Sequence, residues 1–175
     1  MRLAFNGAQL GPVCLSDCYP QKAICFDHRT AVIHQEPSGN CAGSSDAELG
    51  GLSPAGGGFW LTFVSSEGRS SRDVALAFVS NQGAVQLYWL TETPSVQESN
   101  AHLAAYGGKL FAAWQAGGEM LAALADATGA VIQGPEKITA DFNQQTDFVN
   151  FPNGDVGWAF GSGTELFIYR VRLCP

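Results

Sequence analysis

The stretch GGKLFAAWQAGGEMLAALADATGAV, residues 107–131, decides the fold of this chain. Short apolar runs alternate in it with glycine turns, a spacing typical of strands rather than of helices. The segment 119–127 consists largely of Ala, Leu, Met and Glu, which favour a helix when taken alone. Because it lies between two glycine turns of a repeat, we predict a strand there as well.

The same alternation of apolar runs and turns continues on both sides of this stretch. The runs are rich in aromatic and β-branched residues, which favour strands. We predict six strands of this kind: FWLTFV (59–64), VALAFV (74–79), VQLYWL (85–90), KLFAAW (109–114), DVGWAF (155–160) and ELFIYRV (165–171).

An internal repeat runs through these strands. Aligning residues 58–64 with 109–115 and 155–161 places Phe63, Trp114 and Phe160 in register, each in a strand that follows a turn. Later in the repeat a Gly-Ala pair opens a fourth strand; the pairs begin at Gly7, Gly83 and Gly129, and the last two are 46 residues apart (129 minus 83). Four short antiparallel strands in about 45 residues match one blade of a β-propeller.

The repeat therefore predicts an all-β chain with the β-propeller architecture. We expect about three and a half to four four-stranded blades in residues 1–175, which form a single domain or part of a larger propeller. The repeats fall at about 47–92, 95–140 and 141–173, the last completed by residues 8–16. We expect residues 8–16 to pair antiparallel with residues 165–172, because each would otherwise expose an unpaired strand edge.

The segment LAAYGGKLFAAWQAGGEMLAALADATGAVIQGPEKIT, residues 103–139, resembles the blade repeat of secreted bacterial β-propeller proteins. The resemblance covers residues 47–173 and the first 17 residues. It implies the propeller fold and an extracellular or periplasmic location, although no signal peptide is visible in MRLAFNG. Propeller repeats of this kind serve adhesion, ligand binding and scaffolding alike, so the resemblance does not select one function.

Residues 18–46 interrupt the repeat and are rich in cysteine. KAICFDH and TAVIHQE could form a first and a second strand, but PSGNCAGSSD reads as a loop. Three interpretations stay open for the cysteines: disulfides in an oxidising compartment, which we favour, free thiols, and zinc bound by Cys14, Cys18, Cys25 and His28. The disulfide candidates are Cys14, Cys18, Cys25, Cys41 and Cys174.

Composition argues against two classes of partner. The chain has 16 acidic and 9 basic residues and a net charge of -7, with no cluster of Lys and Arg. Nucleic acids and anionic membranes both require a concentrated positive patch. No apolar run approaches the roughly 20 residues that span a bilayer. We therefore expect neither nucleic-acid binding nor membrane insertion.

We find no catalytic motif and expect neither an enzyme nor a cofactor. Asp27, His28 and His34 could serve acid–base chemistry, but such residues in a hairpin are more often surface residues. Aromatic rings can stack on sugars, yet we expect core packing for the four tryptophans, which occupy repeat strands: Trp60, Trp89, Trp114 and Trp158.

The leading expectation is a non-enzymatic extracellular binding or adhesion module that recognises a protein or a glycan through propeller loops. The alternative is a structural subunit, or a fragment of a larger multi-chain assembly, with no small ligand. A glycan-active hydrolase is a distant third. In either of the first two cases the chain would need a protein partner or another copy of itself to complete the propeller.

Overall fold

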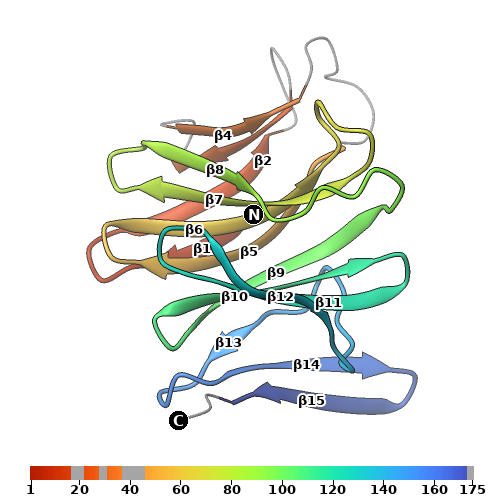
Figure 1. Ribbon diagram of the computed structural model, residues 1–175. Helices are drawn as coiled ribbons and strands as arrows, with labels where there is room; N and C mark the ends of the chain where they lie inside the picture. Colours follow the sequence, from red (N-terminus) through yellow and green to blue (C-terminus); the bar gives the residue numbers. More distant parts are fainter. Residues whose placement is uncertain (17–21, 28–30, 37–45, 173–175) are drawn as a thin grey trace.

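The computed structural model describes residues 1–16, 22–27, 31–36 and 46–172, which form fifteen strands in four antiparallel sheets (Figure 1). The sheets, here named A to D, follow one another along the chain. Sheet A contains β1 (Arg2–Phe5), β2 (Leu10–Ser16), β3 (Ala23–Phe26) and β4 (Ala31–Gln35). Sheet B contains β5 (Glu48–Ala55), β6 (Gly58–Ser65), β7 (Asp73–Ser80) and β8 (Val85–Trp89).

Sheets C and D continue the series. Sheet C contains β9 (Glu98–Tyr106), β10 (Lys109–Ala116), β11 (Glu119–Ala125) and β12 (Val131–Lys137). Sheet D contains three strands, β13 (Val149–Asn150), β14 (Val156–Ser162) and β15 (Glu165–Val171). The all-β class and the six predicted strands are confirmed, and so is the strand predicted within 119–127, which is β11.

The sheets stack face to face in chain order, with an apolar core between each pair of neighbours (Figure 1). Successive residues of a strand point to opposite faces of its sheet. In β6 this alternation sends Phe63 towards sheet A and Trp60 towards sheet C. Trp114 of β10 likewise faces sheet B, whereas Phe111 faces sheet D. The central strands of the two middle sheets are therefore buried on both faces, whereas the outer strand β12 is exposed.

The predicted closure between the ends of the chain is wrong. Strand β2, which covers most of residues 8–16, pairs with β1 and β3 in sheet A, and β15 pairs with β14 alone. The reason is that the Gly-Ala signal marks a type of turn and not a particular hairpin. Gly7 has a φ of 91° and Gly129 a φ of 85°. Gly7, however, joins the first and second strands of its sheet, and Gly129 the third and fourth.

The interpretation of residues 18–46 as an interruption also needs correction. KAICFDH and TAVIHQE contain the third and fourth strands of sheet A, not a first and a second. With β1 and β2 in front of them they complete a regular four-stranded sheet. The prediction failed because β1 is only four residues long and was not recognised. The loop predicted at PSGNCAGSSD lies mostly outside the described residues.

The first strands of sheets B and C approach each other very closely. Strand β5 has an irregular register between Leu49 and Leu52, and Gly50 and Gly51 lie there. A Cβ atom on Gly51 would lie 2.3 Å from the backbone nitrogen of Leu103 on β9. The N–H of Gly51 donates a hydrogen bond to Oγ1 of Thr62 at 3.0 Å. Only glycine fits between the two strands without a backbone shift.

Replacing Gly51 with alanine should therefore destabilise the chain. We expect Gly51→Ala to lower the free energy of unfolding by about 1–3 kcal/mol, the usual effect of overpacking against atoms that cannot move aside. Gly56→Ala is the matched control, because its Cβ would meet nothing within 4 Å, and it should change stability by less than about 0.5 kcal/mol. Urea unfolding followed by tryptophan fluorescence measures both, and equal effects would contradict the packing argument.

Candidate functional site

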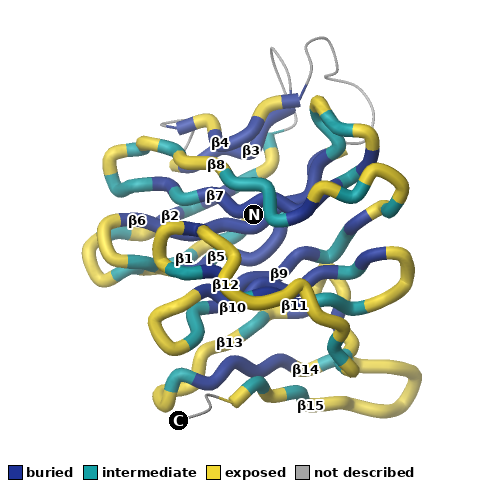
Figure 2. Tube along the Cα trace, in the orientation of Figure 1, coloured by how far each residue is buried: buried dark blue, intermediate teal, exposed yellow. Residues whose placement is uncertain are grey.

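The outer face of sheet D, which points away from sheet C, is apolar and exposed. Leu166 and Ile168 of β15 are 70% and 69% exposed, and Val149 of β13 is 50% exposed. The ring of Phe151 lies over Gly157 on this face, and the guanidinium of Arg170 lies 5.1 Å from the ring centre. Figure 2 shows β15 as largely exposed, in contrast to the strands of the middle sheets.

Sheet A exposes an apolar face at the opposite end of the stack. Leu3 and Phe5 of β1 are each 59% exposed, Leu10 of β2 is 60% exposed and Val32 of β4 is 46% exposed. Ala4, between the first two, packs against the core with sheet B, so its neighbours on the strand point outward. The described residues thus form an open stack whose two ends are both apolar.

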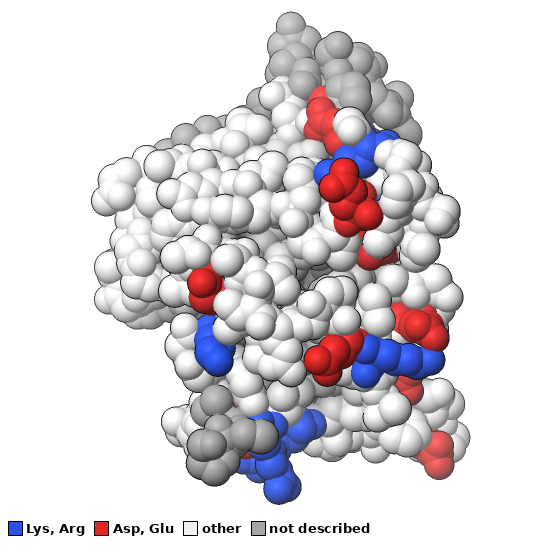
Figure 3. All heavy atoms as spheres, viewed as in Figure 1, with Lys and Arg blue, Asp and Glu red and all other residues white. Residues whose placement is uncertain are grey.

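Charged side chains are sparse on the face of the molecule that Figure 3 shows, and several of them occur in pairs of opposite sign. In Figure 3 acidic and basic atoms lie next to each other rather than in a patch of one sign. Lys137, for example, bonds Glu119 at 2.6 Å, and Arg170 lies 2.5 Å from Asp155. None of the described residues belongs to a helix with the length and apolar character that crossing a membrane would require.

The inner strands of sheets A, B and C meet the segment before β13 at a cavity of about 330 Å3. Arg2 of β1 reaches across it and holds three partners. Its Nε donates to the carbonyl oxygen of Gly50 at 2.9 Å, and its two terminal nitrogens donate to Asp147 at 2.7 Å and to the carbonyl oxygen of Gln144 at 3.1 Å. One side chain therefore links sheets A and B to the chain that leads into sheet D.

His102 of β9 also lines this cavity and is only 2% exposed. Its ring stacks on Phe148 with the ring centres 4.7 Å apart, and Nε2 lies 2.9 Å from the carbonyl oxygen of Asn143. A carbonyl only accepts, so Nε2 carries the proton and donates it. Burial lowers the pKa of His102 to about 4, so the ring is neutral at pH 7.

The depressed pKa of His102 makes the folded chain less stable in acid. The unfolded chain takes up the proton near pH 6.5 and the folded chain only near pH 4. The free energy of unfolding should therefore decrease as the pH falls from 6.5 to 4, by about 3 kcal/mol at about 1.4 kcal/mol per pKa unit. His102→Gln keeps a donor but does not titrate, so it should show a smaller loss. Denaturant unfolding at pH 7, 5.5 and 4 tests this, and equal losses in both proteins would contradict it.

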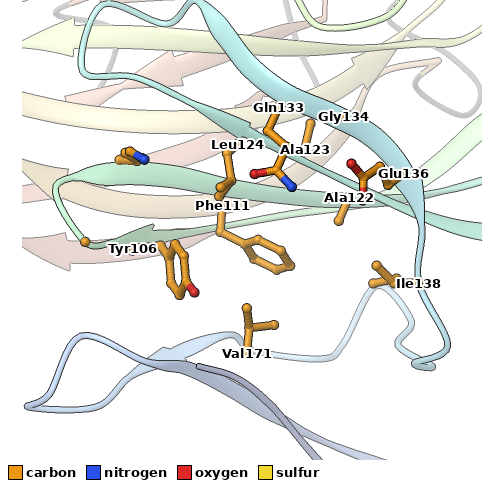
Figure 4. Close-up of a pocket in the computed structure, with 12 residues that line it drawn as sticks. Tyr106, Phe111, Ala122, Ala123, Leu124, Gln133, Gly134, Glu136, Ile138 and Val171 are labelled. Carbon is orange, nitrogen blue, oxygen red and sulfur yellow. The ribbon is translucent and has the colours of Figure 1, made fainter. Parts of the chain in front are cut away.

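A groove of about 400 Å3 lies between the outer strands of sheet C and the free edge of sheet D (Figure 4). Strands of sheet C contribute Tyr106, Phe111 and Leu124 to the lining of the groove. Ile138, which follows β12, and Val171 of β15 complete its apolar part. The hydroxyl of Tyr106 donates to the carbonyl oxygen of Arg172 at the end of β15. The groove is therefore mainly apolar, with Gln133 and Glu136 of β12 at its rim.

A buried polar cluster joins sheets B and C. Glu98, 1% exposed, accepts hydrogen bonds from the backbone N–H of Val74 at 3.0 Å, from the hydroxyl of Thr91 and from Nε1 of Trp114 at 3.2 Å. Burial raises the pKa of Glu98. Its neighbour Asp73 is held by Arg69, whose Nε lies 2.5 Å from Oδ2.

The pKa of Asp73 moves in the other direction. Burial opposes its ionisation, but the hydrogen bonds from Arg69 and Thr93 together outweigh burial and lower the pKa. Two carboxyl groups with opposite shifts can form an acid–base pair. Here both are occupied by groups of the chain itself, and neither lines the cavity at Arg2 or the groove beside β15. The cluster holds the two sheets together.

The residues considered for metal binding and disulfides are only partly described. Cys14 and Cys25 lie opposite each other on β2 and β3, and no disulfide joins them. Cys18, Cys41, Cys174 and His28 lie outside the described residues. Within the described ranges no group of three or more His, Cys, Asp or Glu side chains is arranged to hold a metal ion.

A disulfide that involves at least one of the other three cysteines stays a prediction. It should add about 2–4 kcal/mol to the stability of the chain. Alkylation under denaturing, non-reducing conditions followed by mass spectrometry should label fewer than five cysteines, and reductant should restore all five. Five labels without reductant would show that every cysteine is a free thiol.

The other candidate residues take structural positions. His34 is 8% exposed, and its Nε2 lies 2.9 Å from the Ser65 hydroxyl and 3.1 Å from a Glu67 carboxylate oxygen, while Asp27 is exposed at the end of β3. Three tryptophans are buried in the cores, as predicted: Trp60, Trp114 and Trp158. Trp89 is half-buried beneath the guanidinium of Arg69, at 4.2 Å.

Sequence reasoning expected that a partner or another copy would be needed to complete the propeller, but it did not locate the two apolar end faces or the groove. ELFIYRV reads like any buried strand, and only the position of sheet D at the end of the stack exposes it. In the comparisons with known proteins, no family model matches the chain, and neither a curated protein nor a solved structure is similar enough to count as a match.

Proposed function

We propose that the chain is a non-catalytic assembly module whose end sheets dock on further copies of the chain. The observation that carries the proposal is the pair of exposed apolar faces on sheets A and D. Large exposed apolar patches mark interaction surfaces in soluble proteins. The structural-subunit alternative is thus favoured over recognition of a glycan or protein through loops.

The three interfaces inside the chain identify the occupant of each end face. Sheet A packs on sheet B, sheet B on sheet C and sheet C on sheet D. In each contact, the face of one sheet that points towards the C-terminal end of the stack packs on the face of the next sheet that points towards the N-terminal end. Sheet D has no next sheet among the described residues and sheet A has no preceding one. The outer face of sheet D therefore docks on sheet A of a second copy, which continues the same packing.

This contact joins two different faces, so it is heterologous. It buries Leu166 and Ile168 of one copy against Leu3 and Phe5 of the next. A series of such contacts closes into a ring or extends as a filament, depending on the rotation between copies. Both products bury the apolar ends, which explains how a chain with so few charged residues could stay in solution.

The assembly proposal predicts the mass of the chain in solution. Light scattering should give at least twice the 18.5 kDa of one chain. Leu166→Glu with Ile168→Glu, and separately Leu3→Glu with Phe5→Glu, should each give single chains, because a charge placed in an apolar interface is costly. Ile132→Glu is the matched control, since Ile132 is 48% exposed but lies on β12 of a middle sheet, and it should leave the assembly intact.

Two outcomes would contradict parts of this proposal. Dissociation by the sheet D pair alone would indicate docking of sheet D on sheet D and would contradict the head-to-tail contact. A wild-type chain that melts cooperatively as an 18.5 kDa monomer would overturn the assembly proposal altogether. Circular dichroism of each variant shows whether dissociation reflects a lost contact or a lost fold.

A further inference from the structure

The free edge of β15 and the groove beside it form a second surface, separate from the outer face of sheet D. Within the described residues sheet D has three strands, whereas sheets A, B and C have four each. A strand added next to β15 would cover the groove between sheets C and D. We propose that this edge is an acceptor site for an extended, apolar peptide segment of a partner protein.

Sheet B shows how a fourth strand occupies the equivalent place. On β7 the residues that face the preceding sheet, Ala75 and Ala77, lie opposite Trp89 and Leu87 of β8. Trp89 fills the outer part of the space between sheets A and B, with its ring 6.0 Å from Phe63 and 6.5 Å from His34. Val85 and Trp89 of the fourth strand thus pack on the preceding sheet, whereas Leu87 between them is 41% exposed.

On β15, Tyr169 and Val171 likewise face the preceding sheet, which is sheet C. Residues of an added strand that lie opposite them point towards Phe111, Leu124 and Ile138 across the groove. These lining side chains are apolar, and the described residues leave a space of about 400 Å3 there. The geometry therefore selects apolar side chains at alternate positions of the added strand.

The backbone of β15 is suited to the same partner. In an antiparallel ladder every second residue turns its N–H and C=O away from its neighbour, and β15 pairs on one side only. Extended peptides bind exposed sheet edges through such groups, and side-chain pockets give the specificity.

The edge of β15 also lacks the features that usually block strand addition. Proteins protect edges with proline, with lysine and other charged residues, or with short strands. The outer strand of sheet C, β12, carries Pro135, Glu136 and Lys137. Strand β15 is seven residues long, and its centre, 166–169, is Leu-Phe-Ile-Tyr, without a charge or a proline. The edge of β15 is therefore less protected against strand addition than the edge of β12.

A synthetic peptide with the sequence of residues 83–90, GAVQLYWL, is the probe, because it is the fourth strand of sheet B with its turn. Fluorescence anisotropy of the labelled peptide measures binding to the full chain. Two further peptides carry N-methyl groups on alternate backbone nitrogens, one at odd and one at even positions. Strand addition uses only one of these two sets, so one form should lose at least tenfold in affinity and the other should bind like the parent.

A substitution in the groove supplies the matched test on the protein. Leu124→Glu should weaken binding at least tenfold, whereas Leu87→Glu adds the same charge at an exposed residue outside the groove and should change affinity less than twofold. Thermal melts show whether each variant is folded. Because Leu124→Glu could disturb the core, hydrogen exchange of the wild-type chain is the independent measurement: the peptide should slow exchange at every second amide of residues 165–171.

The outcomes separate this site from head-to-tail assembly. The variant Leu3→Glu/Phe5→Glu changes only sheet A, which takes no part in the acceptor site, and should bind the peptide within twofold of the wild type. A wild-type monomer that binds the peptide would overturn assembly alone. Absence of binding, equal binding of both N-methylated forms, or unchanged exchange in β15 would each overturn the acceptor site, whatever the mass in solution.

Discussion

Every sheet of this chain carries apolar side chains on both faces, and the architecture follows from the need to cover them. A sheet buries an apolar face by packing it against another element, so a sheet that is apolar on both faces is fully buried only between two neighbours. Sheets B and C find both within the chain. Among the described residues sheets A and D each pack on one other sheet, which leaves Leu3 and Phe5 exposed at one end and Leu166 and Ile168 at the other. The end faces are the continuation of the internal cores rather than a separate feature.

Strand positions could be predicted because glycine turns and apolar runs are local signals. The repeat alignment also gave the correct orientation, since Phe63 and Trp114 both face the preceding sheet. Strand pairing could not be obtained in the same way. Gly7 and Gly129 form turns of the same kind in different hairpins, and a turn does not show which strands it joins. Strand β1 is only four residues long, and its hydrophobic pattern was too short to show that it begins a sheet.

The candidate sites were less predictable still, because they depend on what is absent beside a strand. The sequence of β15 resembles those of β6 and β7, which are buried, and its exposure arises from its place in the stack. Some of the cysteines and histidines considered as site residues lie outside the described residues. Among the described ones, His34 is buried in the core. Residues with distinctive chemistry are easy to notice, whereas a surface made of ordinary apolar residues is recognised only in three dimensions.

Polar contacts between the sheets serve a different purpose from the apolar cores. Apolar packing is not directional and permits two sheets to slide, whereas hydrogen bonds fix a register. Glu98 ties the start of sheet C to Val74 of sheet B, and Arg2 ties sheet A to the chain before sheet D. Both lie at first strands of their sheets, near the close contact at Gly51. The inner edge of the stack is therefore fixed by polar groups and by close backbone packing, while the outer strands combine side-chain packing with polar contacts such as those of His34 with Ser65 and of Tyr106 with Arg172. Among the described residues sheet D has no strand beyond β15 at this outer edge, and a strand added there would extend the apolar packing between sheets C and D.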